Sequence, residues 1–78
     1  YTGTIPTKTL KKGSKGTDVT NLQKFLKWYG CDLGKHGVDG EFGDDTYAAL
    51  KKFEKAMGVT VNGIWETKDV NKAKTVKK

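Results

Sequence analysis

The chain has 78 residues, of which 35% are hydrophobic and 31% are charged. A chain this short accommodates one domain with a modest core. No apolar run approaches the roughly 20 residues of a bilayer-spanning helix, so we expect no contact with a membrane. The chain also opens without an initiator Met or a signal peptide, which suggests a processed piece of a longer protein. Its single cysteine, Cys31, excludes an internal disulfide.

The net charge is +6 at pH 7, and all 15 basic residues are lysines. A basic domain is attracted to polyanions such as nucleic acid, anionic lipid or acidic wall polymers. Proteins that read nucleic acids, however, depend on arginine, whose planar guanidinium binds phosphate and guanine through paired hydrogen bonds. A chain without arginine therefore favours a solvated basic surface, and we expect no specific nucleic-acid partner.

The first third of the chain predicts a linker followed by a helix. Residues 1–9 show no apolar periodicity and are predicted to be a linker from an upstream domain. A turn-rich stretch then leads to a helix over 18–29, with Thr17 or Asp18 as its capping residue. Gly30 is placed to end this helix. Its apolar stripe comprises Val19, Leu22, Leu26 and Tyr29, with Phe25 beside them.

The rest of the chain predicts two further helices. Five glycines within 30–43 indicate a loop, and a second helix follows with acidic residues in its first turn and Gly58 at its end. Its inward stripe comprises Thr46, Ala49, Leu50, Phe53 and Met57. A short third helix is predicted over 67–74, and residues 75–78 form a basic, frayed tail. The expected fold class is all-α, a small three-helix bundle with glycine-rich loops.

One phrase occurs twice, each time directly before a helix. The first turn (38–42) reads Val38-Asp39-Gly40-Glu41-Phe42, and the second turn (61–65) reads Val61-Asn62-Gly63-Ile64-Trp65. In such a phrase the Asx side chain binds the turn backbone, the glycine takes a positive φ and the aromatic ring closes the core. The two copies indicate an internal helix–loop repeat.

Catalytic and metal-binding residues are not expected in this chain. A nucleophile needs an activating base, and the only candidates are Cys31 and His36, five residues apart on a glycine-rich loop that holds geometry poorly. One cysteine and one histidine are too few for a zinc site. The acidic residues of 39–45 lack the spacing of an EF-hand. We therefore expect no metal and no cofactor.

The chain resembles the type 1 peptidoglycan-binding domains in three segments that together span residues 10–74. The opening segment reads Leu10-x-x-Gly13-x-x-Gly16-x-x-Val19-x-x-Leu22-Gln23-x-x-Leu26. The second reads Asp39-Gly40-x-Phe42-Gly43-x-x-Thr46-x-x-Ala49-x-x-x-Phe53, and the closing one Gly58-Val59-x-Val61-Asn62-Gly63-Ile64. Many members have Phe-Gln where this chain has Phe53-Glu54. Many also have a closing Asp-Gly-x-x-Gly where this chain has Asn62 and Glu66.

The resemblance implies a non-catalytic module that binds peptidoglycan and anchors an attached wall hydrolase. That enzyme would be an amidase, endopeptidase or muramidase, as in a lysin or autolysin. The expected location is the extracellular cell wall, reached by secretion or by release of a phage-encoded protein at lysis. We expect a monomer tethered to its catalytic domain. Two alternatives remain open, namely electrostatic binding of wall teichoic acid or another polyanion, and a prodomain-like role in protein interaction.

Aromatic residues are the main candidates for contact with the glycan and the stem peptide. Trp28 and Tyr47 lie on the flanks of predicted helices, where an exposed ring can pack against the C–H face of a sugar. The alternative for Trp28 is packing on the following loop. Trp65 echoes Phe42, which favours a place in the core. The proposed ligand-binding residues are Trp28, Asp39, Gly43, Tyr47, Lys51 and Trp65, with Lys51 available for a stem-peptide carboxylate.

Overall fold

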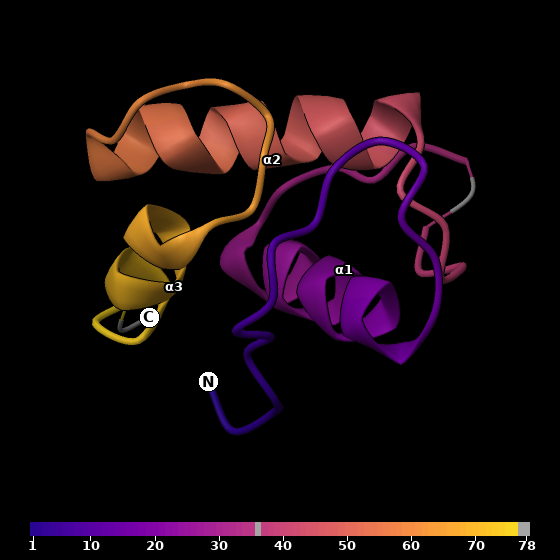
Figure 1. Cartoon of the computed structure of the whole chain (residues 1–78), viewed down its shortest axis with the longest axis horizontal. Coiled ribbons are helices and arrows are strands. Elements are labelled where there is room, and N and C mark those ends of the chain that lie inside the picture. The colour runs from indigo at the N-terminus through magenta and orange to yellow at the C-terminus, as the bar shows by residue number, and fades with distance from the viewer. Residues whose placement is uncertain (36, 77–78) are drawn as a thin grey trace.

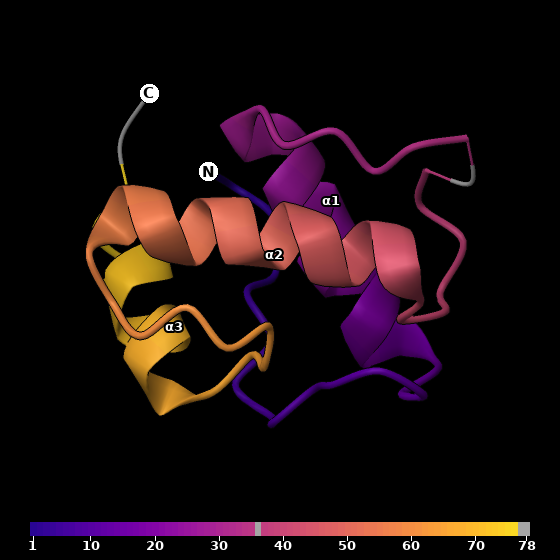
Figure 2. The same ribbon diagram turned by 90° about the horizontal axis from the view of Figure 1, so that it is seen from above.

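The computed structural model describes residues 1–35 and 37–76. It contains three helices, α1 (Thr17–Tyr29), α2 (Asp44–Met57) and α3 (Thr67–Ala73). Helix α2 lies along one side of the molecule, with α1 and α3 beneath it (Figure 1). Seen from above, α2 crosses over α1 (Figure 2). The predicted all-α three-helix fold is confirmed, and the third helix ends one residue earlier than expected.

Glycines mark both ends of α1 and the end of α2. Gly30 and Gly58 adopt the left-handed conformation, with φ of 114° and 74°, and their N–H groups bind carbonyls of the preceding turn. The predicted cap of α1 is wrong. Thr17 and Asp18 already lie inside the helix, and the capping position is occupied by Gly16, which has no side chain to bind the first N–H groups.

Aromatic rings from the three parts of the bundle meet in the core. Phe25 of α1, Phe53 of α2 and Trp65 before α3 are fully buried, with ring centroids 5.3 to 6.0 Å apart. The predicted inward stripes are confirmed, while Tyr29 and Met57 are half-buried at the edge of the core. The buried stripe residues are Val19, Leu22, Phe25, Leu26, Thr46, Ala49, Leu50 and Phe53.

The segment before Leu10 packs against the bundle. The indole Nε1 of Trp65 donates a hydrogen bond to the carbonyl of Pro6 at 2.8 Å, and Pro6 is buried. The ring of Tyr1 meets that of Phe25 edge-on at 5.4 Å. Leu10 exchanges two backbone hydrogen bonds with Trp65, at 2.9 and 2.8 Å. Residues 1–9 therefore contribute contacts to the fold, and their role as a linker to an upstream domain stays a prediction.

A buried side chain on the preceding helix holds each of the two turns. The Oε1 atom of Gln23 accepts hydrogen bonds from the N–H groups of Asp39 and Gly40, at 3.0 and 2.8 Å. The Oε1 atom of Glu54 accepts the equivalent pair from the second turn, also at 3.0 and 2.8 Å. Both side chains are fully buried. The predicted internal repeat is thus seen in the hydrogen-bond pattern as well as in the sequence.

The two repeats differ in how they supply the matching donor. The Nε2 atom of Gln23 donates to the Asx side chain of its turn and to the third residue of α2, each at 2.9 Å. Glu54 has no such donor, and the ammonium of Lys68 supplies it, 2.6 Å from Glu54 Oε2. The same ammonium donates to Asn62 at 3.3 Å and to Asp69, the third residue of α3, at 3.0 Å. Glu54 and Lys68 together therefore replace one amide.

Candidate functional site

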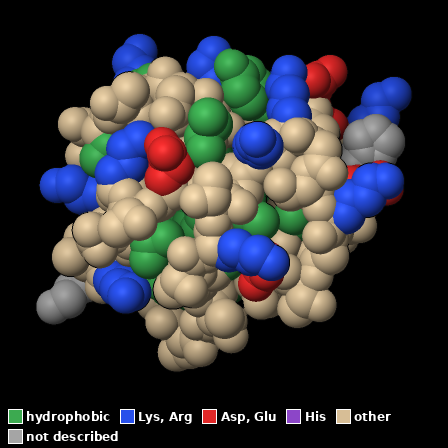
Figure 3. All heavy atoms as spheres, in the orientation of Figure 1, with side chains coloured by type: hydrophobic (Ala, Val, Ile, Leu, Met, Phe, Trp, Pro, Cys, Tyr) green, Lys and Arg blue, Asp and Glu red, His purple; other side chains and the backbone are tan. Residues whose placement is uncertain are grey.

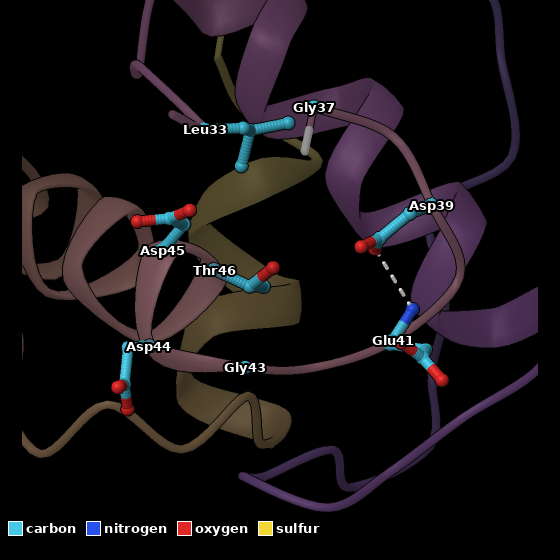
Figure 4. Close-up of a pocket in the computed structure, with 8 residues that line it drawn as sticks. All are labelled: Leu33, Gly37, Asp39, Glu41, Gly43, Asp44, Asp45 and Thr46. Atoms are coloured by element: carbon cyan, nitrogen blue, oxygen red, sulfur yellow. Dashed lines mark hydrogen bonds between the residues drawn. The ribbon is translucent and has the colours of Figure 1, made fainter. Parts of the chain in front are cut away.

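A pocket of about 370 Å³ lies between the first turn, the loop before it and the start of α2 (Figure 4). It brings together two of the residues proposed from the sequence, Asp39 and Gly43. The residues that line it are Leu33, Gly37, Asp39, Glu41, Gly43, Asp44, Asp45 and Thr46. The concave surface is thus formed by the loop before the first turn, the turn itself and the start of the helix that follows it.

Hydrogen bonds fix the shape of this pocket. The Oδ1 atom of Asp39 accepts from Gln23 Nε2 at 2.9 Å and from the N–H of Glu41 at 3.0 Å. Figure 4 shows the Asp39 carboxylate facing the space that Asp45 and Thr46 border from α2. Because buried Gln23 binds both the backbone and the side chain of the turn, the Asp39 carboxylate is held in place before any ligand arrives.

The pocket is acidic although the chain as a whole is basic. Half of its lining residues are Asp or Glu, whereas lysines predominate among the charged side chains on the face shown in Figure 3. The ion pairs at its rim are exposed: Lys12 lies 3.1 Å from Asp44, and Lys15 lies 3.9 Å from Glu41. Exposed pairs contribute little stability, so a ligand can displace these lysines at small cost. The pocket therefore favours a cationic or hydrogen-bond-donating group.

A second cluster surrounds Tyr47 on α2 and adjoins the pocket. The ammonium groups of Lys12 and Lys51 lie 4.2 and 5.1 Å from the centroid of the Tyr47 ring. The ring packs so closely on Gly63 that a Cβ at this glycine would collide with it. Tyr47 is half-buried as a result. Lys12 also pairs with Asp44 at the pocket rim, so the two clusters share a border.

The two tryptophans have different environments. Trp28 is half-buried and lies among other rings, with centroids 5.1 Å from Tyr1 and 5.9 Å from Phe25. Trp65 is fully buried, as expected from its position in the repeated phrase, which matches that of buried Phe42. A ligand cannot reach a side chain with no exposed surface. The assignment of Trp65 to ligand binding is therefore wrong in this structure, and its role is to hold the core.

Cys31 and the acidic side chains were also considered from the sequence as candidates for catalysis or metal binding. Burial raises the pKa of the Cys31 thiol, and the positive charge of Lys52 opposes that rise only in part, so the reactive thiolate is disfavoured. Its proposed base, His36, lies outside the described residues. Within 1–35 and 37–76, no three Asp, Glu, His or Cys side chains are grouped for a metal ion, and no helix is long and apolar enough to cross a bilayer.

Several residues that shape the pocket and the two turns were not singled out from the sequence. Gln23 lies four residues after Val19 and three before Leu26, hence on the inward face of α1. A polar side chain on such a face needs internal partners, and this signal was available in the sequence. Lys12 and Lys68 gave no comparable signal, because Asp44, the partner of Lys12, and Glu54, the buried helix α2 partner of Lys68, lie far from them in the chain.

The geometry agrees with the comparisons to known proteins. Residues 15–69, which include α1, both turns and α2, match the model of the family described as "Putative peptidoglycan binding domain". The chain belongs to this family. Its fold matches the crystal structure of the SleB N-terminal domain, with 36% identity and a TM-score of 0.79 over 90% of this chain and 93% of that one.

Enzymes of cell-wall metabolism contain similar segments. The N-acetylmuramoyl-L-alanine amidase CwlL of Bacillus licheniformis is 44% identical over 64 residues, which are 82% of this chain and 17% of that enzyme. A spore cortex-lytic enzyme of Bacillus cereus is 44% identical over 55 residues, which are 70% of this chain and 20% of the enzyme. The peptidoglycan-binding domain therefore spans a fifth or less of these relatives.

Proposed function

We propose that this domain holds an attached peptidoglycan hydrolase, such as an amidase, endopeptidase or muramidase, against the bacterial cell wall outside the cell. The family match over both turns carries this proposal. It is supported by relatives that are an amidase and a cortex-lytic enzyme, in which the matched segments make up only 17% and 20% of the length. In this arrangement the domain contributes binding as a tethered monomer, and the catalytic residues belong to the rest of the protein.

We further propose that peptidoglycan lies along the surface from the pocket to the Tyr47 cluster. Asp39 and Gly43 stand at one end of this surface, and Tyr47 with Lys51 at the other. The acidic pocket suits an amine of the stem peptide, whereas Lys12 and Lys51 suit a carboxylate. The outer face of a half-buried ring suits a sugar. Trp28 stays a proposed contact, and buried Trp65 is left out.

Co-sedimentation with purified, acid-stripped sacculi tests the function. Acid treatment removes teichoic acid, so binding that survives it at physiological salt is binding to peptidoglycan itself. Binding to a polyanion would instead disappear with the acid-labile polymer and would weaken steeply as salt is added. Failure of the domain to sediment with stripped sacculi would overturn the proposal.

Matched variants test the surface. Asp39→Asn removes a negative charge from the pocket and keeps the side-chain oxygen that accepts from the N–H of Glu41. Its control, Asp32→Asn, removes a negative charge from a turn outside the pocket and keeps the oxygen that accepts from the N–H of Gly34. Lys51→Gln is paired with Lys24→Gln on the exposed face of α1. We expect about a tenfold loss of affinity for the first of each pair, equivalent to one charge-assisted contact. Equal losses within a pair would place the ligand elsewhere.

A further inference from the structure

Three ionisable side chains are packed together where α2 meets the start of α3. Glu54 and Asp69 are fully buried, and the side chain of Lys68 between them is 26% exposed. The ammonium of Lys68 lies 2.6 Å from Glu54 Oε2, 3.0 Å from Asp69 Oδ2 and 3.8 Å from the carboxylate of Glu66. One cation thus serves three carboxylates, and two of these have no access to water.

One oxygen in this cluster lacks a partner. Asp69 Oδ2 accepts from the N–H of Glu66 and from Lys68, but Oδ1 is buried without a hydrogen bond. A proton on Asp69 would turn this oxygen into a donor toward Glu54. Burial, followed by the hydrogen bond that the protonated carboxyl can make with Glu54, raises the pKa of Asp69 from 3.8 to about 6, against the opposing effects of the Glu66 N–H and the Lys68 ammonium.

We propose that the Glu54–Lys68–Asp69 cluster takes up one proton from solvent under mildly acidic conditions and thereby tightens the second turn against α2. Protonation forms an O–H bond on Asp69 and removes one of two buried negative charges. Without that proton, repulsion between the Glu54 and Asp69 carboxylates favours separation of the short helix α3 from α2.

The second turn links this cluster to the surface of the domain. Glu54 Oε1 holds the N–H groups of Asn62 and Gly63. Gly63 packs against the ring of Tyr47, whose centroid lies 4.2 and 5.1 Å from the ammonium groups of Lys12 and Lys51. A change in the charge of the cluster therefore acts on the backbone directly beneath Tyr47. The inference itself does not depend on which ligand Tyr47 contacts.

The direction of the pH effect follows from proton binding. The folded state binds the proton near pH 6, and the unfolded state releases it near pH 3.8. Because the folded state holds more protons between these values, this contribution to stability is complete at low pH and decreases as pH rises through 6. For these two values, the folding equilibrium constant should decrease about tenfold between pH 5 and pH 8.

Urea denaturation between pH 5 and pH 8 tests the proposal on the intact chain. Asp69→Asn places an uncharged donor where the protonated acid stands, and Asp18→Asn is the control in the first turn of α1. From pH 5 to pH 8, the folding equilibrium constants of wild type and Asp18→Asn should each decrease about tenfold relative to that of Asp69→Asn. In wild type, the amide resonance of Gly63 and the ring resonances of Tyr47 should shift with a midpoint near pH 6.

Carbon-13 NMR of the Asp69 carboxyl gives a second test that needs no variant. A titration midpoint of the Asp69 carboxyl resonance below pH 4.5 would overturn the proposal. So would a ratio of the folding equilibrium constants of wild type and Asp69→Asn that is constant from pH 5 to pH 8. Neither measurement involves peptidoglycan. A negative result here is therefore distinct from a failure to bind sacculi.

Discussion

Replacement of Lys68 by methionine removes the donor that the second turn borrows from α3. Methionine retains an apolar stem of similar length, so the main change is the loss of the ammonium. Glu54 and Asp69 would then be two buried carboxylates without a cation. We expect a large loss of stability in the wild-type background. We expect a small loss when Glu54→Gln is already present, because the new amide can donate to Asn62 and Asp69 as Gln23 does in the first turn.

The magnitude follows from burial. Removing one member of a buried ion pair costs about 3–5 kcal/mol. The Lys68 side chain is 26% exposed, so water can replace part of its interaction, and about 2–3 kcal/mol is the expected cost. With the amide in place the cost should drop below about 1 kcal/mol, the value of one net hydrogen bond. The coupling energy between the two positions is then about 2 kcal/mol.

Urea unfolding of the four proteins of this cycle, followed by the fluorescence of Trp28 and Trp65, measures the coupling. Far-ultraviolet circular dichroism checks that each variant folds. If Lys68→Met costs the same in both backgrounds, Lys68 and Glu54 contribute independently. The equivalence of their pair to the Gln23 amide would then be wrong.

Three further predictions concern the supports of the fold, and urea midpoints check the first two. Gly63→Ala should lower the free energy of unfolding by about 1–3 kcal/mol more than Gly58→Ala, because both place a Cβ at positive φ but only the Cβ at position 63 collides with Tyr47. Equal losses would refute that contact. Gln23→Leu should cost about 3–5 kcal/mol, since five hydrogen bonds of a buried side chain are lost. A cost below 1 kcal/mol would contradict this role. Trp65→Phe removes the bond to the Pro6 carbonyl, so amide hydrogen exchange in residues 1–9 should accelerate while α2 stays protected.

Local signals predicted most of the fold. The spacing of Val19, Leu22 and Leu26 gave the buried face of α1, and Gly30 and Gly58 gave the helix ends, because helical period and left-handed caps depend on neighbouring residues only. The cap of α1 was mispredicted at Thr17 or Asp18. Good capping residues lie beside a glycine that occupies the position itself, and sequence preference cannot separate neighbours this close.

The site was less predictable, because it depends on contacts between distant residues. Asp39 and Gly43, which were proposed from the sequence as ligand contacts, line one pocket, and their role in binding stays a prediction. The acidic residues of 39–45 were noticed in the sequence, but the sequence did not predict that they line one pocket on a chain with a net charge of +6. That charge averages over the surface, whereas a pocket depends on the few side chains that border it. The substitution of Glu54 for glutamine was noticed, but its partner Lys68 lies 14 residues away.

The shared role of Glu54 and Lys68 constrains the order in which the two residues could have been acquired. A glutamate that arrived first would have been an uncompensated charge in a dry interior. A lysine that arrived first could have extended into solvent at little cost, since its side chain retains partial exposure. Starting from a glutamine at position 54, the order in which lysine is acquired before glutamate therefore costs less stability. Reversal is open only in the opposite sequence, so the presence of Glu54 prevents Lys68 from being replaced first.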